Sequence, residues 1–280
     1  MRTARRLGFL LLAGIAWLAA APLAAAPGEG VRGLELLAAQ GEHDGAPFLA
    51  GIDLRLAEGW KTYWKKPGDS GIPPVFDWSA SENVAGVELR WPAPERFDAP
   101  GDITYGYEGG VVWPLRVVPE DASRAVTLRL SMFYGICSDI CVPREANLEL
   151  TVPREANLEL TVPPGAEIED SPVASRLRAA LGRIPVPPAD PGMLDIRWRE
   201  ASAPALEVSL SGCGKGCTPP MLIVDGPKNI WFGTPRVKRD GDVVRYVMEV
   251  EVLSPAMLEG VELDFILSGP DTAYVIRKTM

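Results

Sequence analysis

The amino-acid sequence predicts an all-β protein made of two antiparallel sandwiches. Several short segments alternate apolar and polar residues, as strands with one face in a core do, and turn-rich stretches separate them. The chain is much longer than the roughly 100 residues of a single sandwich. A helical segment and a proline-rich stretch divide it. The composition, 47% hydrophobic and 23% charged, is that of a folded globular protein.

Residues 1–26 are expected to be a secretory signal peptide. Three arginines precede an apolar run over residues 7–21, and three alanines at 24–26 form a small-residue cleavage site. The run is shorter than the roughly 20 residues of a membrane span, so we expect an exported protein that does not itself cross a membrane. An uncleaved N-terminal anchor is the alternative. Export would place all four cysteines in an oxidising compartment.

The first sandwich is expected over residues 31–163. Residues 126–132 alternate apolar and polar side chains, which indicates a strand with one buried face. Glycine, proline and aspartate gather at residues 66–71 and 109–110, and such clusters indicate turns between strands.

Residues 164–191 are expected to connect the two sandwiches. A helix is predicted over residues 171–181, where Ser171 can cap the first turn and Pro172 suits the first helical position. Gly182 is expected to end the helix in a left-handed conformation. Four prolines between residues 185 and 191 then predict a stiff, extended connector.

The second sandwich is expected over residues 192–280. Residues 206–210, 244–252 and 261–267 again alternate apolar and polar side chains, and residues 240–242 supply a turn. The pattern therefore predicts strands on both sides of the connector.

A ten-residue segment is repeated without change, because residues 142–151 recur as residues 152–161. Ten is an even number, so a strand made from either copy presents the same side chains to each face. Either copy could therefore occupy one position in a sheet while the other extends it or forms a loop. A tandem duplication tolerated at the surface, or a sequence error, explains the repeat better than a functional role.

The chain is acidic, with a net charge of −9, and it has no basic run. Binding to a phosphate backbone needs clustered cations. We therefore expect no nucleic-acid partner.

The four cysteines form two pairs with the same spacing, Cys137 with Cys141 and Cys213 with Cys217. Three intervening residues can make a tight turn between adjacent antiparallel strands, so the sulfurs of each pair could meet. A disulfide across so short a loop stabilises a fold by only about 2 kcal/mol. For Cys137 and Cys141 this leaves a redox-active pair and a structural staple as alternatives.

Metal binding is the third alternative for the cysteines. Four thiolates could hold zinc tetrahedrally if the two domains brought them together, or could bind the softer copper(I). The chain has one histidine, which nearly excludes a mixed cysteine and histidine site. We expect no bound metal and no cofactor.

The second pair lies among glycines and before two prolines, which predicts a flexible loop with exposed sulfurs. Lys215, between Cys213 and Cys217, could favour a thiolate. A local disulfide that ties a glycine-rich hairpin and a redox-active pair are equally compatible with this pattern.

The sequence around the first pair, YGICSDICVP at residues 134–143, resembles the cysteine signature of the N-terminal periplasmic domain of the thiol:disulfide interchange protein DsbD and of ScsB-type proteins. Three earlier segments are similar to that family in the same order: GWKTYWKKPGDSG at 59–71, FDW at 76–78 and WPAPERF at 91–97. Later segments resemble the second sandwich of the ScsB-type ectodomain more weakly: VDGP at 224–227, FG at 232–233 and PAMLEG at 255–260.

This resemblance implies immunoglobulin-like sandwiches and a periplasmic location. It also implies that Cys137 and Cys141 accept electrons from a membrane-embedded thiol:disulfide transporter and pass them to oxidised periplasmic proteins of the thioredoxin-like kind. The family covers its cysteines with an aromatic loop, which corresponds here to residues 97–108, with Phe97, Tyr105 and Tyr107 as candidates. Of the aromatic residues at 60–64, only those on one face of a strand can approach the site.

The sequence departs from the full-length family proteins in two respects. It has no transmembrane helices and no thioredoxin-like module, so we expect the electron donor to be a separate polypeptide. The resemblance supplies no role for Cys213 and Cys217, which we expect to form a local disulfide. The main hypothesis is a thiol-disulfide relay, in which Asp139 could tune proton uptake. A disulfide-stapled binding or adaptor module and a copper(I)-binding protein are the alternatives.

Overall fold

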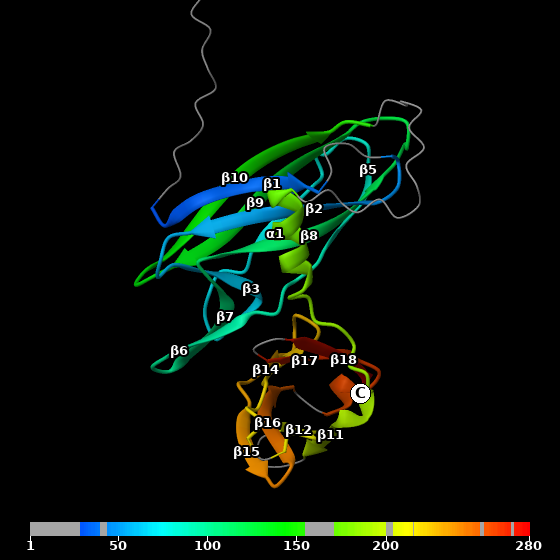
Figure 1. Ribbon diagram of the computed structural model, residues 1–280. Helices are drawn as coiled ribbons and strands as arrows, with labels where there is room; N and C mark the ends of the chain where they lie inside the picture. The colour runs from blue at the N-terminus through cyan, green and yellow to red at the C-terminus, as the bar shows by residue number, and fades with distance from the viewer. Residues whose placement is uncertain are drawn as a thin grey trace, which may run out of the picture.

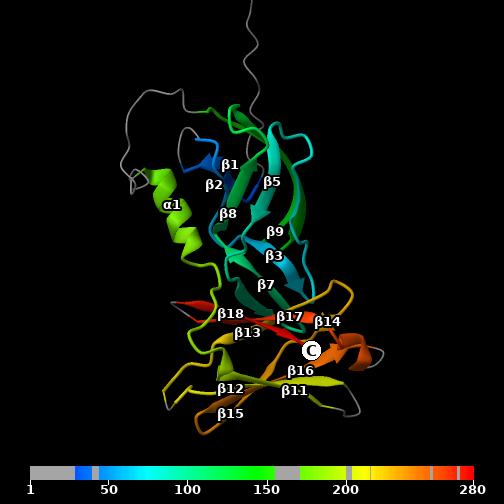
Figure 2. The same cartoon turned by 90° about the vertical axis from the view of Figure 1, so that its right-hand side faces the viewer.

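The computed structural model describes residues 29–39, 44–154, 171–199, 204–214, 216–252, 255–269 and 272–280. Antiparallel strands dominate and form two sandwiches that lie end to end, the first built from the N-terminal half of the chain (Figures 1 and 2). The predicted all-β fold with two sandwiches is confirmed. The signal peptide expected over residues 1–26 lies outside the described residues.

The first sandwich consists of two sheets. The smaller sheet has the order β1-β2-β8-β5, with β1 (Val31–Ala38), β2 (Phe48–Leu56), β8 (Gly110–Pro119) and β5 (Val84–Leu89). The larger has the order β10-β9-β3-β7-β6, with β10 (Cys141–Val152), β9 (Val126–Cys137), β3 (Lys61–Gly68), β7 (Asp102–Glu108) and β6 (Glu95–Ala99). The short strand β4 (Val75–Asp77) also pairs with β9.

Strand β9 shows how the sequence pattern sets the two faces of the larger sheet. The predicted strand at 126–132 is confirmed, and it continues to Cys137. Its even-numbered residues, from Val126 to Ile136, are buried in the core between the sheets, as period-two alternation requires. Phe133, Gly135 and Cys137 therefore point to the opposite face, which we call the outer face of the sheet.

Helix α1 (Pro172–Leu181) packs on the first sandwich, against β8, β1 and β2 (Figure 2). Ser171 caps it as predicted, because its Oγ accepts a hydrogen bond from the Ala174 N–H at 3.0 Å. Leu177 is fully buried and fits against Gly51, where a Cβ atom would lie 2.5 Å from the leucine side chain. The predicted left-handed end is wrong. Gly182 has a φ of −63° and continues the right-handed turn.

The second sandwich also has two sheets, and the strands predicted in it are confirmed. One sheet has the order β11-β12-β16-β14, with β11 (Leu194–Arg199), β12 (Ala205–Leu210), β16 (Val243–Glu251) and β14 (Trp231–Phe232); β15 (Arg236–Asp240) also pairs with β16. The other has the order β13-β17-β18, with β13 (Met221–Asp225), β17 (Glu262–Ser268) and β18 (Ala273–Thr279). Two short 3₁₀ helices, η1 (Pro191–Met193) and η2 (Pro255–Leu258), complete it.

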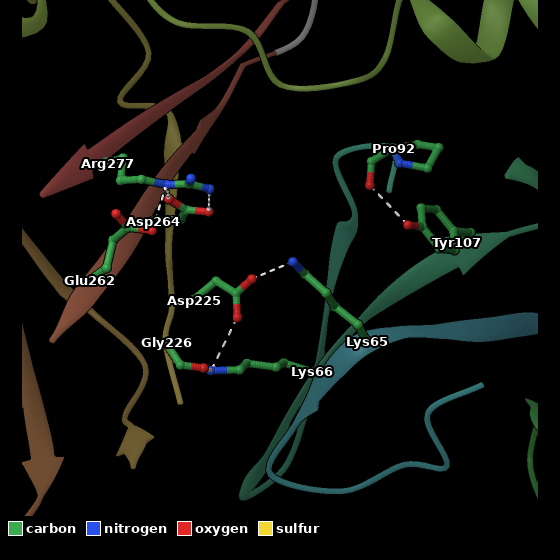
Figure 3. Close-up of polar contacts among 9 residues, drawn as sticks. All are labelled: Lys65, Lys66, Pro92, Tyr107, Asp225, Gly226, Glu262, Asp264 and Arg277. Atoms are coloured by element: carbon green, nitrogen blue, oxygen red, sulfur yellow. Dashed lines mark hydrogen bonds and ion pairs between the residues drawn. The ribbon is translucent and has the colours of Figure 1, made fainter. Parts of the chain in front are cut away.

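Polar contacts join the sandwiches at the end of β3. Lys65 and Lys66 form ion pairs with Asp225 of β13, and the Lys66 ammonium also donates a hydrogen bond to the Gly226 carbonyl (Figure 3). Beside these contacts lies a cavity of about 490 Å³ lined by residues of both sandwiches, including Tyr105 and Trp231. Strand β3 therefore belongs to the first sandwich and contacts the second.

The first copy of the duplicated segment forms most of β10, which pairs with β9 from Cys141↔Cys137 to Val152↔Val126. Of the second copy, residues 152–154 continue from this strand, and residues 155–161 lie outside the described part of the chain. Either copy could have formed the strand next to β9, and in the structure the first copy forms it.

Candidate functional site: two cysteine loops

The first cysteine loop is the turn of the β9–β10 hairpin. Cys137 ends β9, Cys141 begins β10, and the two residues stand opposite each other in the strand register. Residues 138–140 form the turn, and Ile140 at its tip is 73% exposed. The structure joins the two cysteines in a disulfide. The three-residue spacing brings the sulfurs together because antiparallel strands place them side by side.

The two cysteines of this pair differ in accessibility. Cys137 is 6% exposed, whereas Cys141 is an exposed residue at the edge of the sheet. A protein thiolate must contact the sulfur that it attacks. Cys141 is therefore the residue that a docking partner can reach.

Tyr63 of β3 makes the closest polar contact to the pair. Its hydroxyl lies 3.0 Å from Cys141 Sγ, and its ring crosses the outer face of the sheet next to Gly135. Burial, and then the charge of Asp102, raise the pKa of Tyr63, so the hydroxyl keeps its proton and donates to the sulfur. The sequence indicated only that one subset of residues 60–64 can approach the cysteines, and did not single out Tyr63.

Phe97 lies on the same face as the cysteines. It pairs with Thr104 across β6 and β7, while Lys61 pairs with Cys137 across β3 and β9. The Lys61 ammonium links these positions, because it lies 4.6 Å from the centre of the Phe97 ring and 3.3 Å from Thr104 Oγ1. Phe97 is therefore placed on the outer face of β6, two strands away from β3, which carries the lysine that flanks Cys137.

Tyr105 and Tyr107, the other two candidates for the aromatic cover, point into the core. Side chains alternate between the two faces of a strand, so Tyr105 and Tyr107 point to the face opposite to that of Thr104. Tyr107 is fully buried, its ring packs edge-on against Trp113, and its hydroxyl donates to the Pro92 carbonyl at 2.9 Å (Figure 3). Burial raises the pKa of both tyrosines. Of the three aromatic residues expected to cover the cysteines, Phe97 lies on the cysteine face, and the expectation for Tyr105 and Tyr107 is corrected.

Ile72 is a residue of the site that the sequence did not indicate. It lies in the loop after β3 and packs on Gly135, where a Cβ atom would come within 2.6 Å of the Ile72 Cβ. Tyr63 packs on the same glycine. Because Gly135 has no side chain, Ile72 and Tyr63 can pack directly on β9 at this position, two residues before Cys137.

The second cysteine loop connects β12 to β13. A disulfide joins Cys213 to Cys217, in agreement with the expected local pairing. The expected exposure of both sulfurs is wrong for Cys213, which is 3% exposed and belongs to the core, whereas Cys217 is exposed. Lys215, which could favour a thiolate, lies outside the described residues.

Arg239 of β15 supplies the positive charge at this second loop. Its guanidinium donates hydrogen bonds to the carbonyls of Cys213 and Gly214, at 3.0 and 2.9 Å, and to that of Cys217. One of its nitrogens lies 3.6 Å from Cys213 Sγ. No pattern in the sequence indicated this contact, because Arg239 reaches the loop through the pairing of β15 with β16.

Within the described residues, no group of three or more histidine, cysteine or acidic side chains could hold a metal ion. Across the same part of the chain, no helix has the length and apolar character needed to cross a membrane.

The fold and the first cysteine loop define a β-sandwich domain with a disulfide hairpin at its surface. Residues 35–153, which make up most of the first sandwich, match the family model described as thiol:disulfide interchange protein DsbD, N-terminal, and the resemblance seen in the sequence is confirmed. The match implies involvement in thiol-disulfide exchange and a membrane partner domain.

A solved structure extends the likeness to both sandwiches. The N-terminal periplasmic domain of ScsB from Proteus mirabilis matches with a TM-score of 0.63 and 23% identity, over 85% of this chain and 90% of that chain. At this identity the match shows a shared fold. A comparison with curated proteins finds no match.

Proposed function

We propose that the protein is an exported, periplasmic thiol-disulfide relay that works through Cys137 and Cys141. It accepts electrons from a membrane-embedded thiol:disulfide transporter, a separate polypeptide, and passes them to oxidised thioredoxin-like proteins of the periplasm. The observation that carries this proposal is the contact between the Tyr63 hydroxyl and the sulfur of Cys141, an exposed residue, in a domain that matches the DsbD N-terminal family.

In the accepting step, a donor thiolate attacks Cys141 Sγ and the Cys137–Cys141 bond breaks. The donor is now linked to Cys141, and Cys137 leaves as a thiolate that takes up a proton. The second thiol of the donor loses a proton and attacks the donor sulfur of this mixed disulfide, which releases Cys141. The donor dithiol has lost two electrons, and the pair has gained them.

In the delivering step the reduced pair runs the same chemistry on an acceptor. The Cys141 thiolate attacks one sulfur of the acceptor disulfide, and the Cys137 thiolate then attacks Cys141 Sγ to restore the internal disulfide. The acceptor leaves with two thiols. A hydrogen bond from Tyr63 stabilises the charged form of Cys141 and so lowers its pKa, which raises the thiolate fraction at neutral pH.

The cover over the cysteine face is Phe97, Tyr63 and Ile72 in this proposal. Apolar groups beside a reduced pair limit the access of small oxidants, and a docking partner displaces them. Phe97 is the member best placed to move, because it lies on the edge strand β6, whereas Tyr63 is almost fully buried.

The test is equilibration of the mature protein with glutathione buffers, followed by thiol trapping and mass mapping of each pair. The Cys137–Cys141 pair should change state well above about −300 mV, the potential below which structural disulfides resist reduction. A pair that stays oxidised throughout would favour a disulfide-stapled binding module instead.

A further inference from the structure

We propose that Cys213 and Cys217 form a second redox site, at which a protein dithiol attacks Cys217 and Arg239 stabilises the departing Cys213 thiolate. The site is independent of the relay proposed for Cys137 and Cys141, because its residues belong to the other sandwich.

The first argument is the difference in exposure within the pair. Cys217 is exposed, and Cys213 is packed in the core of the second sandwich. An incoming thiolate can therefore reach one sulfur of this disulfide. The other sulfur becomes the leaving group.

The second argument is the cation at the buried sulfur. Exchange is faster when the leaving thiol has a low pKa, and a positive charge within about 4–6 Å lowers the pKa of a thiol. The Arg239 guanidinium lies 3.6 Å from Cys213 Sγ. Its hydrogen bonds to three carbonyls of the loop hold it there.

The third argument is the surface beside the exposed sulfur. Both cysteines line a hollow of about 180 Å³, whose walls include Leu210, Leu267 and Tyr274. A partner that brings a thiolate to Cys217 can place an apolar side chain in this hollow. A disulfide that serves only as a staple requires neither this hollow nor the cation, and across a five-residue loop it stabilises weakly.

The reaction begins when a partner thiolate attacks Cys217 Sγ. The Cys213–Cys217 bond breaks, a partner–Cys217 disulfide forms, and Cys213 leaves as a thiolate beside Arg239. The second thiol of the partner loses its proton and attacks the partner sulfur in the mixed disulfide. Cys217 then leaves as a thiolate and takes up that proton. The partner dithiol becomes a disulfide, and the cysteine pair gains its two electrons.

The first experiment uses the mature chain with Cys137→Ser and Cys141→Ser, so the outcome does not depend on the first pair. The protein is equilibrated with dithiothreitol and glutathione buffers, and free thiols are trapped and mapped. We expect Cys213 and Cys217 to be reduced and reoxidised reversibly, with the glutathione adduct found on Cys217. A pair that stays oxidised, or an adduct found on Cys213, overturns the proposal.

The second experiment tests Arg239 as a positioning residue, in the same background with Cys217→Ser. Absorbance of the thiolate against pH gives the pKa of the single thiol, Cys213. We expect Arg239→Gln to raise this pKa enough to lower the thiolate fraction at neutral pH about tenfold. Arg236→Gln on the same strand, which removes the same charge from an ion pair with Glu249, should leave it unchanged.

Further variants of Arg239 and the remaining ionisable groups of the loop complete this test. Among the described residues, the other ionisable groups at the loop are Asp242, beside Gly214, and Tyr246, whose hydroxyl donates to the Pro220 carbonyl. Lys215, between the two cysteines in the sequence, is ionisable as well. None of the three is altered in these variants. Arg239→Met also removes the charge and replaces Arg239→Gln if that variant does not fold, whereas Arg239→Lys keeps the charge and should retain most of the effect. A Cys213 pKa that is equal in the parent and in the folded variant without the charge overturns the role of Arg239.

Discussion

The two cysteine loops have the same spacing and the same arrangement of one buried and one exposed sulfur, but different surroundings. In the first sandwich the pair closes a strand hairpin, and a tyrosine hydroxyl contacts the exposed sulfur. In the second the pair closes an irregular loop, and an arginine approaches the buried sulfur. Spacing determines which cysteines pair, and the neighbouring strands determine which sulfur is stabilised as a thiolate.

This difference predicts different roles for the exposed cysteine. A hydrogen-bond donor beside the sulfur of the exposed cysteine favours that cysteine as a nucleophile after reduction, which suits a protein that passes electrons on. A cation at the buried sulfur favours its departure, which suits a disulfide that accepts electrons. The predictions below test whether the surroundings of each loop have these effects.

The largest effect is expected from single cysteine variants of the first loop. Cys137→Ser should accumulate a mixed disulfide on Cys141 in cells that contain the membrane transporter, since the resolving thiol is missing. Cys141→Ser should accumulate none, because the buried Cys137 is not reached. Non-reducing gels followed by mass mapping detect the adduct.

The matched control is Cys213→Ser with Cys217→Ser in the Cys137→Ser chain, which should leave the adduct on Cys141 in place. An adduct that disappears in this control would mean that the two loops act in series.

Gly135→Ala should disturb the cover of the first loop. The new Cβ would lie 2.6 Å from the Ile72 Cβ and 3.2 Å from the Tyr63 ring, so both must shift. We expect a loss of about 1–3 kcal/mol in the free energy of unfolding, measured in urea, the usual cost of overpacking. Gly214→Ala in the second loop, whose nearest atom is 3.8 Å away, should change it by less than about 0.5 kcal/mol. Equal costs would refute the contrast between a covered and an open loop.

Tyr63→Phe should keep the ring and remove the hydrogen bond to Cys141. The reduced protein should react with a disulfide probe about fivefold more slowly at neutral pH, because fewer Cys141 thiols are ionised. Tyr246→Phe, which removes a hydroxyl bonded to a backbone carbonyl in the second sandwich, is the control and should react at the normal rate.

The pH dependence of the Tyr63 effect has a defined sign. Burial raises the pKa of Tyr63, so the hydroxyl remains a donor up to and beyond its ordinary value of about 10. The rate difference should shrink as the pH rises through the ordinary thiol pKa of about 8.5, and should be nearly gone at about pH 10, where most of the Cys141 thiol is ionised without the hydrogen bond. A difference that persists there would point to a role of Tyr63 in access to the sulfur.

Phe97→Ala should speed alkylation of the reduced first pair, since this ring is part of the cover proposed for the cysteine face. Tyr105→Phe, at a core-facing position of the adjacent strand, is the control and should leave the alkylation rate unchanged. The same rate for Phe97→Ala and the parent chain would remove Phe97 from the cover.

The smallest effect is expected from Asp139→Asn in the first turn. Asp139 is exposed, and solvent screens its charge from the sulfurs. The exchange rate should change by less than about twofold. A larger change would show that Asp139 takes part in proton uptake.

Local patterns in the sequence were enough to predict four of the strands and to indicate that the sulfurs within each cysteine loop could meet. Alternation over residues 126–132 identified β9, and the cysteine spacing indicated sulfurs that could meet. Both are properties of short segments, since the period of a strand and the reach of a tight turn depend on a few neighbouring residues.

The contacts around the sulfurs could not be predicted, because they depend on the register between distant strands. Thr62 pairs with Tyr107 and Lys61 with Cys137, and these pairings assign Tyr63 to the cysteine face and Tyr107 to the core. A shift of one residue would exchange the faces. Arg239 is likewise brought to Cys213 by sheet pairing and not by its distance along the chain.

The duplicated segment gives the Cys137–Cys141 bond a consequence for folding. The second copy could align with β9 as well as the first, with the connection lengthened from residues 138–140 to residues 138–150. The longer connection costs only about 1 kcal/mol more in loop-closure entropy. A hairpin made from the second copy would therefore compete with the observed one, and the Cys137–Cys141 bond admits the one that begins at Cys141. Formation of this bond thus fixes the register of the sheet edge as well as holding two oxidising equivalents.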